Sequence, residues 1–330
     1  MPRPSEDDLI ARHFAPLAGP GGLGLLDDAA LVRTPPGREI VLTKDALVAG
    51  VHFFADDPPA DIARKALRVN LSDLAAKGAD PLGFALALAL PGDWTEDWLA
   101  DFCRGLAEDA AQYAMPLLGG DTVKTPGPLM VCVTALGSVP EGAMVRRTGV
   151  RAGDALYVTG TVGDAALGLR IRLAEPKDAR WIAALGAGSR AFLLERYMLP
   201  RPRNALARVL RACASGGMDV SDGFAGDLAK MLRVSGVGGR VELAQVPLSA
   251  AALEAQALDS KSLEIALTGG DDYEIICSVP EMRAHDFEHG ARQAGVAVSR
   301  IGVAVDGEGL RLCTREGREL VLRQSSYSHF

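Results

Sequence analysis

The chain has 330 residues, a length that predicts about two domains. Hydrophobic residues make up 48% and charged residues 23% of it, so the composition predicts buried cores. The formal net charge of -7 argues against a general nucleic-acid surface, because proteins hold phosphate backbones mainly with clustered Lys and Arg.

The cysteines and the apolar segments narrow the class further. The five cysteines are scattered without a C-x-x-C pair, which favours free thiols over a disulfide framework or a zinc site. The acidic N-terminus lacks the apolar core of a signal peptide, and the most apolar segment, at 82–91, is too short to span a bilayer. We therefore expect a soluble, cytoplasmic protein that binds neither nucleic acid nor a membrane.

The first half of the chain is expected to mix helices and strands around one sheet. Ser5 and Asp8 predict the start of a helix, which the glycine-rich segment 19–24 ends. Apolar residues at helical spacing predict helices over 58–81 and 95–114. Strands are expected at 39–48, 82–90 and 129–139.

The polar, glycine-punctuated stretch 139–154 is the candidate domain boundary. Beyond it, strands and helices alternate again. Strands are expected at 155–161, 240–243, 273–279, 298–305 and 310–322, and helices at 163–173, 178–214, 223–235, 249–267 and 281–294.

Six acidic segments stand where a strand or helix is expected to end in a turn, most of them beside glycine. A single Asp-Gly pair is usually a solvated turn, but several such segments predict a shared site. Carboxylates about 4 Å apart repel by roughly 4 kcal/mol at an effective dielectric near 20, so positive charge must lie among them. The acids are Asp27 with Asp28, Asp45, Asp73, Asp121, Asp219 with Asp222, and Asp271 with Asp272 and Glu274.

Hard divalent cations are the economical source of that positive charge, because these segments hold few Lys or Arg residues. Carboxylates and hydroxyls such as those of Thr43 and Ser221 suit Mg²⁺, which prefers phosphate oxygens as further ligands. Glycines let backbone N–H groups approach phosphates closely. The sequence has no Gly-Lys dipeptide for a P-loop and no H-R-D or D-F-G string for a protein kinase, so it predicts a magnesium-nucleotide site of another kind.

A series of motifs along nearly the whole chain resembles those of the thiamine-monophosphate kinases, whose superfamily includes aminoimidazole ribonucleotide synthetase and selenophosphate synthetase. The motifs are DDAAL, TKDALVAGVHF, KALRVNLSDLAAKGADP, LLGGDT, RRTGVRAGD, YVTGTVGDAALGL, YMLPRPR, MDVSDG, LTGGDDYE and the terminal YSHF. The resemblance implies ATP-dependent phosphorylation of thiamine monophosphate to thiamine diphosphate. It also implies a homodimer whose N-terminal strands pair across subunits.

The fold that this resemblance implies is an α/β (α+β) fold of the PurM-like, two-domain type. An N-terminal mixed sheet with helices on one side is expected over 1–145, where it binds ATP and Mg²⁺ and forms the dimer. A C-terminal α+β domain is expected over 146–330.

The resemblance also assigns site residues. Several Mg²⁺ ions are expected per site, with ATP as co-substrate. The implied metal positions are Asp28, Thr43, Lys44, Asp45, Asp73, Asp121, Asp219 and Asp222, of which Asp45, Asp73, Asp121 and Asp219 are also the implied catalytic residues. The implied ATP-binding positions are Tyr113, Gly120, Asp121, Arg147 and Ser221, and the implied substrate-binding positions are His52, Asp271 and Tyr327.

This sequence departs from the family pattern at three positions. Leu26 stands where Gly is usual, Lys44 stands where Thr is usual, and Asp271 replaces the commoner Glu. Lysine has no hydroxyl, so the metal contact at Lys44 is made by its backbone carbonyl, is lost, or is replaced by the charge of its ammonium group. Asp271 is one methylene shorter than Glu, which shortens its reach toward the substrate.

The acceptor chemistry predicts the mechanism. A phosphate monoester has a second pKa of about 6 and is largely ionised near neutral pH, so it needs little deprotonation. The obstacle is the repulsion between two phosphate groups. We therefore expect direct in-line transfer without a phosphoenzyme, with the four catalytic aspartates acting through metal ions and Arg147 clamping phosphates.

Some residues have simpler interpretations. His285 and His289 match an H-x-x-E-H zinc string, but helical spacing places them opposite Phe287, so they are expected to face water. Trp98 and Phe102 are expected in the core. The acids expected on solvated faces or at helix N-termini are Asp56, Asp57, Asp61, Asp227 and those within 106–110.

Two other functions stay open. One is a different ATP-dependent synthetase of the same superfamily, although selenophosphate synthetase is disfavoured because no cysteine precedes Cys103. The other is a non-catalytic nucleotide-binding regulatory module, for which Lys44 is the only indication.

Overall fold

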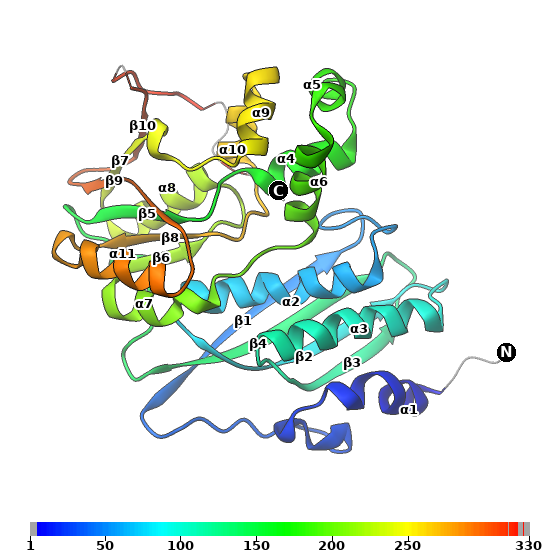
Figure 1. Cartoon of the computed structure of the whole chain (residues 1–330). Helices are drawn as coiled ribbons and strands as arrows, with labels where there is room; N and C mark the ends of the chain where they lie inside the picture. Colours follow the sequence, from blue (N-terminus) through cyan, green and yellow to red (C-terminus); the bar gives the residue numbers. More distant parts are fainter. Residues whose placement is uncertain (1–4, 316, 323–325, 327–330) are drawn as a thin grey trace. The chain divides into compact units, whose positions relative to one another are not determined.

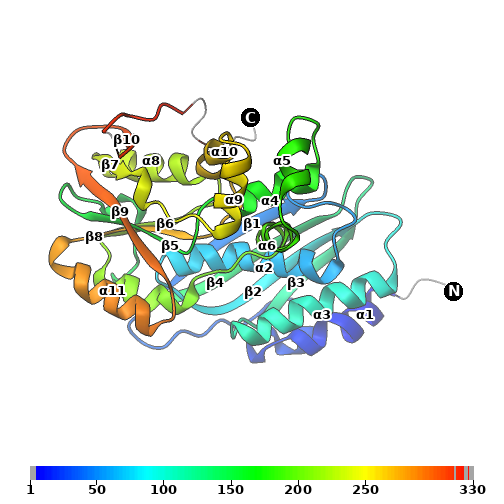
Figure 2. The same cartoon turned by 45° about the horizontal axis from the view of Figure 1, so that its top comes forward.

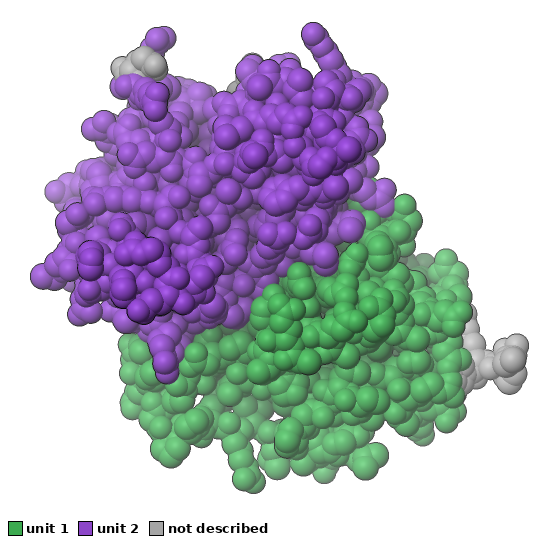
Figure 3. All heavy atoms as spheres, viewed as in Figure 1, with its two compact units in different colours: residues 1–74, 79–143 green, residues 75–78, 144–330 purple. Residues whose placement is uncertain are grey.

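The computed structural model of the chain describes residues 5–315, 317–322 and 326. It divides into two compact units, drawn in green and purple in Figure 3. Unit 1 comprises Met1–Leu74 and Ala79–Ala143, and unit 2 comprises Ala75–Gly78 and Met144–Phe330. Each unit is built on one sheet that combines parallel and antiparallel strands with packed helices, which confirms the predicted α/β class (Figure 1).

Unit 1 is built on a four-stranded sheet with the order β1-β4-β2-β3. The long strand β4 pairs antiparallel with both β1 and β2, and β3 lies parallel to β2 at the sheet edge. The strands are β1 (Arg38–Val48), β2 (Asp80–Leu90), β3 (Leu117–Lys124) and β4 (Met130–Pro140). The helical segments are α1 (Glu6–Leu9), η1 (Ile10–Phe14), η2 (Ala15–Leu17), η3 (Pro20–Leu25), α2 (Pro59–Ala76) and α3 (Glu96–Gln112).

Helices α2 and α3 lie side by side on one face of this sheet (Figures 1 and 2). Thr95 caps α3 by accepting a hydrogen bond from the backbone N–H of Trp98. Phe102 is fully buried and stacks on Trp98 with 5.3 Å between ring centroids, which confirms Phe102 as a core residue. Along β1, Val41 and Leu47 are buried on the helix-covered face, whereas Leu42 on the opposite face is 64% exposed.

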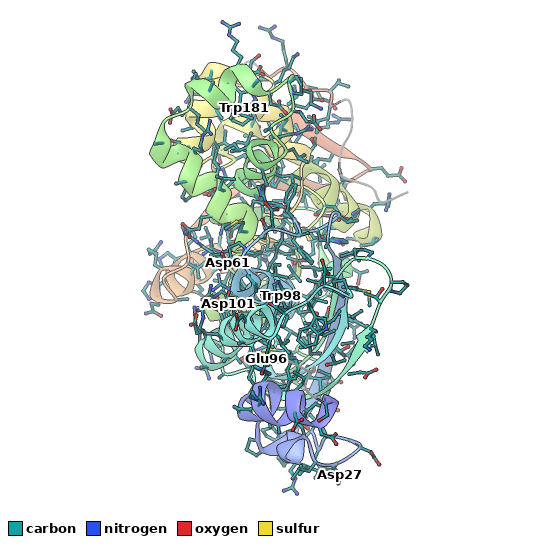
Figure 4. The ribbon with its side chains drawn as sticks, turned by 90° about the vertical axis from the view of Figure 1, so that its right-hand side faces the viewer. Asp27, Asp61, Glu96, Trp98, Asp101 and Trp181 are labelled. Carbon is teal, nitrogen blue, oxygen red and sulfur yellow. The ribbon has the colours of Figure 1, made fainter. Side chains whose placement is uncertain are left out.

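Ion pairs join α2 to α3. The guanidinium of Arg68 donates to both carboxylate oxygens of Asp109 at 2.6 and 2.9 Å, and Arg64 pairs with Glu108. Figure 4 labels Asp61 on α2 and Asp101 on α3, which pair with arginines of their own helices. Asp109 is almost fully buried, so its predicted place on a solvated face is wrong. Its charge is compensated by an arginine that the local sequence does not reveal.

Unit 2 is built on a six-stranded sheet with the order β10-β7-β9-β5-β8-β6. All neighbours pair antiparallel except β10 and β7, which are parallel. The strands are β5 (Ala155–Thr159), β6 (Gly216–Asp219), β7 (Gly238–Glu242), β8 (Ile275–Val279), β9 (Val298–Val305) and β10 (Leu310–Cys313).

Helices cover both faces of this sheet (Figure 1). They are α4 (Asp164–Leu173), α5 (Ala179–Ala184), α6 (Ala187–Met198), α7 (Ala207–Cys213), α8 (Phe224–Ser235), α9 (Ala250–Leu258), α10 (Ser262–Thr268) and α11 (Ala284–Gln293). Short turns of helix occur at η4 (Arg147–Gly149), η5 (Asn204–Leu206), η6 (Leu243–Gln245) and η7 (Glu281–Arg283).

Strand alternation divides the core of unit 2 into two layers. Leu156 and Val158 share a cluster with the apolar residues of α8, while Tyr157 packs with Phe287 of α11 on the other side. A third cluster around Trp181, labelled in Figure 4, joins α4, α5, α6 and α9. Both faces of β5 are therefore buried, which explains its continuously apolar sequence.

The predicted elements agree with the structure except in four respects. The helical stretch predicted over 178–214 is divided into α5, α6 and α7, with no helix at 199–203. The predicted N-terminal helix is one short α-turn followed by π- and 3-10 segments. The strand predicted over 310–322 ends at Cys313. Strands β3 and β6 were not predicted, because their glycines and aspartates break the apolar pattern of a strand.

Candidate active site

Thr43 and Asp73 connect the first strand of unit 1 to its first long helix. Thr43 lies in the middle of β1 and Asp73 in the last turn of α2. The Thr43 hydroxyl donates a hydrogen bond of 2.5 Å to Oδ2 of Asp73. Because alternate residues of a strand share a face, Asp45 points to the same side as Thr43. Three predicted oxygen ligands thus lie on the helix-covered face of the sheet.

The carboxylate of Asp45 is destabilised in this position. Burial raises the pKa of Asp45 to about 6, and the negative charge of Asp73 adds to the rise. Two carboxylates and a hydroxyl are hard oxygen donors, and they fit Mg²⁺, which usually takes one or two carboxylates and completes its shell with waters and phosphates. Among the described residues, no group of three or more His, Cys, Asp or Glu side chains is placed to hold a metal ion. Asp45, Asp73 and Thr43 therefore fit Mg²⁺ as part of its ligand shell and not as a complete protein site.

A pocket of about 520 Å³ lies beside the edge strand β3 of unit 1. Its lining includes Asp27, Asp28, Gly120 and Asp121, so it brings together two of the predicted acidic segments. The backbone N–H of Asp28 bonds to Oδ1 of Asp27 at 2.8 Å, and Figure 4 labels Asp27 on the loop that precedes β1. Both aspartates of this loop are exposed.

Gly120 is required by a close approach of two strands. A Cβ atom at this position would lie 2.0 Å from the carbonyl oxygen of Leu86 on β2. At the neighbouring Gly119, a Cβ would meet nothing within 4 Å. The second glycine of the LLGGDT motif is therefore a packing requirement, while the first leaves space at the pocket.

Strand register separates the predicted ligands of unit 1 into two groups. Asp121 is aligned with Ala87, which is aligned with Cys132 and through it with Ala46. Asp121 and Lys44 therefore point to the face opposite that of Thr43 and Asp45. The structure brings Asp45 and Asp73 together, and it brings Asp28 and Asp121 together, but within unit 1 these two pairs lie on different faces of the sheet.

Two further predicted positions of unit 1 are partly buried. Nδ1 of His52 accepts a hydrogen bond of 3.1 Å from the backbone N–H of Val48, so its ring is held against the end of β1. Tyr113 ends α3, and the guanidinium carbon of Arg68 lies 6.0 Å from the centroid of its ring. Both side chains are ordered by neighbours of their own unit.

In unit 2, two of the predicted segments pair with each other. The backbone N–H of Asp271 bonds to the carbonyl of Ser221, and that of Tyr273 to the carbonyl of Val220, each at 2.9 Å. The N–H of Val220 bonds in turn to the carbonyl of Glu274 at 2.8 Å. The MDVSDG and LTGGDDYE motifs therefore extend the pairing of β6 with β8 beyond the ends of both strands. Asp219, the last residue of β6, is buried at the start of this extension.

Asp227 and Lys230 organise the turn that carries Ser221 and Asp222. Oδ2 of Asp227 accepts the backbone N–H groups of Ser221, Asp222 and Gly223 at 2.9 to 3.2 Å. Nζ of Lys230 lies 2.5 Å from Asp222 and 3.1 Å from Asp227. Burial raises the pKa of Asp227 although these hydrogen bonds oppose the rise. Asp227 stands in the first turn of α8, as a predicted helix N-terminal charge, but it is almost fully buried and not on a solvated face.

The remaining predicted residues are less constrained. The side chain of Arg147 is exposed in η4, and its carbonyl accepts a hydrogen bond from Ser235. Tyr327 lies outside the described residues.

His285 and His289 are exposed and stack on each other, while Phe287 is fully buried, which confirms that the histidine pair faces water. Asp57 is buried and not on a solvated face, and its carboxylate accepts the backbone N–H of Phe54.

The sequence placed Asp272 and Glu274 in an acidic segment but did not predict their structural contacts. Both side chains are completely buried. Asp272 accepts the backbone N–H groups of Gly163 and Ala165 at the start of α4, and Glu274 pairs with two arginines. Burial raises the pKa of Asp272 well above its ordinary value. Arg196 and Arg203, two of the three arginines of the RYMLPRPR segment, were the only sequence signal for this cluster.

No helix among the described residues has the length and apolar composition needed to cross a membrane. The five cysteines form no disulfide, and four of them are buried.

Comparisons with known proteins identify the chain. Residues 26–139 match the family model of the AIR synthase related protein N-terminal domain, and residues 151–313 match that of the C-terminal domain. A thiamine-monophosphate kinase of Caulobacter vibrioides is 44% identical over 99% of this chain and 91% of its own length. That of Escherichia coli K12 is 40% identical over 98% of both chains.

Solved structures agree with these matches and confirm the two-domain PurM-like fold. A thiamine-monophosphate kinase of Stenotrophomonas maltophilia K279a matches with a TM-score of 0.80 and 36% identity, over 90% of this chain and 91% of that one. A structure described as AaThiL complexed with AMPPCP and TMP matches with a TM-score of 0.78 and 26% identity over 100% of both chains. The chain therefore belongs to the thiamine-monophosphate kinase family of the AIR synthase related proteins.

Proposed function

We propose that this chain transfers the γ-phosphoryl group of ATP to thiamine monophosphate and forms thiamine diphosphate. The observation that carries the proposal is the proximity of Asp45 to Asp73, which accepts a hydrogen bond from Thr43, at motif positions for which the resemblance implies magnesium ligands. Full-length similarity to thiamine-monophosphate kinases supports the reaction, and a relative in complex with AMPPCP, an ATP analogue, and TMP supports the two substrates.

Mg²⁺ is the cation that we assign to this reaction. Asp45, Asp73 and Thr43 supply oxygen ligands in unit 1, and Asp28 and Asp121 supply two more at the pocket beside β3. Lys44 contributes its backbone carbonyl, because its side chain points away from Asp45. Asp219 and Asp222 are the ligands proposed in unit 2. When bound, Mg²⁺ supplies the positive charge that offsets the repulsion between the two phosphate groups.

The side chains bind and orient the reactants and do not form a covalent intermediate. The phosphate of thiamine monophosphate is ionised near neutral pH, so Asp45, Asp73, Asp121 and Asp219 serve as metal ligands and not as proton acceptors. Direct in-line transfer then requires only that the attacking oxygen and the γ-phosphorus be held in line.

Other residues are assigned to the two substrates. For ATP we propose the aromatic ring of Tyr113, the backbone of Gly120, the guanidinium of Arg147 and the hydroxyl of Ser221, since planar guanidinium groups and close backbone N–H groups suit phosphates. For thiamine monophosphate we propose His52, Asp271 and Tyr327.

We propose a homodimer that forms through the open face of the unit 1 sheet. Ile40, Leu42 and Val123 share this face by strand register and are 51%, 64% and 47% exposed. Exposed apolar residues on the face of a sheet are unfavourable in water and are usually covered by a partner. We also place the enzyme in the cytoplasm, where five free thiols remain reduced.

Incubation of the protein with ATP, Mg²⁺ and thiamine monophosphate, followed by chromatography, tests this function. Thiamine diphosphate and ADP in equal amounts are expected. ATP-dependent product from aminoimidazole ribonucleotide precursors, with no thiamine diphosphate, would point to another synthetase of the superfamily. Nucleotide binding without any turnover would point to a regulatory module.

A further inference from the structure

In the loop that joins α10 to β8, alternate side chains point into the protein and away from it. Asp272 and Glu274 are completely buried, whereas Asp271 and Tyr273 between and before them are only partly buried. The hydroxyl of Tyr273 lies 3.4 Å from Oδ1 of Asp271, so the two outward side chains form a pair. The loop therefore has two inward anchors and two outward groups.

The backbone conformation of the outward residues is unfavourable. Asp271 has a φ of 72° and Tyr273 a φ of 51°, in the left-handed region that bulky L-residues rarely adopt. Such a conformation costs on the order of 1 to 3 kcal/mol and persists only where the surroundings enforce it. Here the enforcing contacts are the backbone hydrogen bonds of Asp271 and Tyr273 to the 220–221 segment, together with the buried anchors.

Glu274 is held by three donors. Arg203 donates to both of its carboxylate oxygens at 2.7 and 2.5 Å, Arg196 donates at 3.0 Å, and the Thr159 hydroxyl donates at 2.6 Å. Arg196 also donates to the carbonyl of Asp272 at 3.2 Å, so one guanidinium fixes both anchors. Bidentate arginine–carboxylate pairs are rigid and directional. The arrangement fixes the loop in both position and rotation.

Gly160 shows how closely the chain is packed around this cluster. A Cβ at Gly160 would lie 2.3 Å from Oε1 of Glu274 and 2.6 Å from Nη2 of Arg203. The glycine thus leaves room for the ion cluster at the end of β5.

We infer that Arg203, together with Arg196 and Glu274, is a positioning residue that holds Asp271 and Tyr273 toward the thiamine part of the substrate. The inference rests on the proposed function. Thiamine monophosphate carries a cationic thiazolium ring, and an anionic carboxylate beside an aromatic ring is a suitable surface for such a cation. The buried cluster itself touches no substrate and acts through the loop.

The test compares two arginines that stand two positions apart. Arg203→Gln removes the bidentate pair but leaves Glu274 with Arg196 and Thr159. The Arg203 side chain is 22% exposed, so water can reach the glutamine that replaces it. Arg201→Gln is the matched control, because Arg201 pairs with Glu195 at the surface, where the two side chains are 46% and 49% exposed. Arg203→Lys keeps the charge without the planar fork and serves if Arg203→Gln does not fold.

For Arg203→Gln we expect the KM for thiamine monophosphate to rise about tenfold while the KM for ATP changes less than about twofold. Arg203→Lys should give a smaller rise, and Arg201→Gln should change neither KM. Equal rises in both KM values, or an unchanged KM for thiamine monophosphate, would overturn the inference.

A double-mutant cycle separates positioning from general stability. If Arg203 acts through Asp271, then Asp271→Asn should raise the KM much less in the Arg203→Gln background than in the wild type. Additive effects would overturn the inference. Absence of thiamine diphosphate with the wild-type protein would instead contradict the proposed function, so the two failures are distinguishable.

Discussion

The ammonium group of Lys230 lies 2.5 Å from the carboxylate of Asp222, a proposed ligand of Mg²⁺. The same ammonium group lies 3.1 Å from Asp227, whose carboxylate holds the turn 221–223 by three backbone hydrogen bonds. Lys230 therefore neutralises two acids that would otherwise repel each other. A metal ion that binds Asp222 would have to compete with this ammonium group.

This competition predicts the effect of removing the charge of Lys230. In Lys230→Gln, the Mg²⁺ concentration that gives half-maximal activity should fall by about three- to tenfold, because one repelling positive charge is lost near Asp222. Lys230→Arg keeps the charge and should leave that concentration nearly unchanged. A magnesium titration of initial rates measures both variants, and an unchanged or higher requirement in Lys230→Gln would argue against Asp222 as a ligand.

Asp45 should destabilise the folded protein when metal is absent. Its pKa is raised from 3.8 to about 6, so the ionised carboxylate is less stable in the folded state than in the unfolded state. Asp45→Asn should therefore increase the free energy of unfolding by about 1 to 3 kcal/mol above pH 6, in the presence of a chelator.

The pH dependence of this gain follows from the two pKa values. Below 3.8 the carboxyl is protonated in both states, so the variant should gain nothing; the gain should grow between 3.8 and about 6 and then stay constant. Urea unfolding at several pH values measures it. A variant that is less stable than the wild type above pH 6 would contradict the assignment of a repelled carboxylate.

The two glycines of the LLGGDT motif should respond differently to alanine. Gly120→Ala places a Cβ 2.0 Å from the carbonyl oxygen of Leu86 and should lower the free energy of unfolding by about 1 to 3 kcal/mol or more. Gly119→Ala is the control, because its Cβ would meet nothing within 4 Å, and it should change stability by less than about 1 kcal/mol. Chemical denaturation measures the free energy of unfolding of both variants. Equal decreases in the two variants would show that the close approach of Gly120 to Leu86 is not the constraint.

The proposed dimer makes a prediction for the open face of the unit 1 sheet. Leu42→Asp puts a charge on an exposed apolar face and should convert a dimer to a monomer, which halves the mass measured by light scattering. Leu253→Asp is the control, since Leu253 is 52% exposed on α9 of unit 2, and it should leave the dimer intact. A monomeric wild type, or a dimeric Leu42→Asp, would refute an interface on this face.

Regular patterns made most of the fold predictable. The apolar spacing along α2 and α3 and the continuous apolar runs of β2 and β4 point directly to the elements that are observed. Strand β3 could not be predicted in this way, because Gly119, Gly120 and Asp121 lie in its middle and its outer side has only an isolated bridge to Ala18. Its backbone pairing with β2 is a tertiary effect that overrides local propensity.

Buried charge was the main source of error at the site. Asp109 and Asp227 were expected on solvated faces or at helix N-termini and Glu274 in the shared acidic site, yet all three are buried and each is compensated by a partner that only the fold supplies. For Asp109 that partner is Arg68, which is 41 residues away, and for Asp227 it is a row of backbone N–H groups. Motifs identify which acids matter for chemistry, but they do not show which acids are structural.

The most direct measurement of the central claim follows the labelled γ-phosphate of ATP in the presence of thiamine monophosphate and Mg²⁺. The wild-type protein should move the label to the terminal phosphate of thiamine diphosphate, and Asp45→Asn should slow this transfer by roughly a hundredfold or more while Asp97→Asn on the exposed start of α3 does not. Label that stays on ATP or appears only as free phosphate, or an Asp45→Asn variant as active as the wild type, would contradict the account.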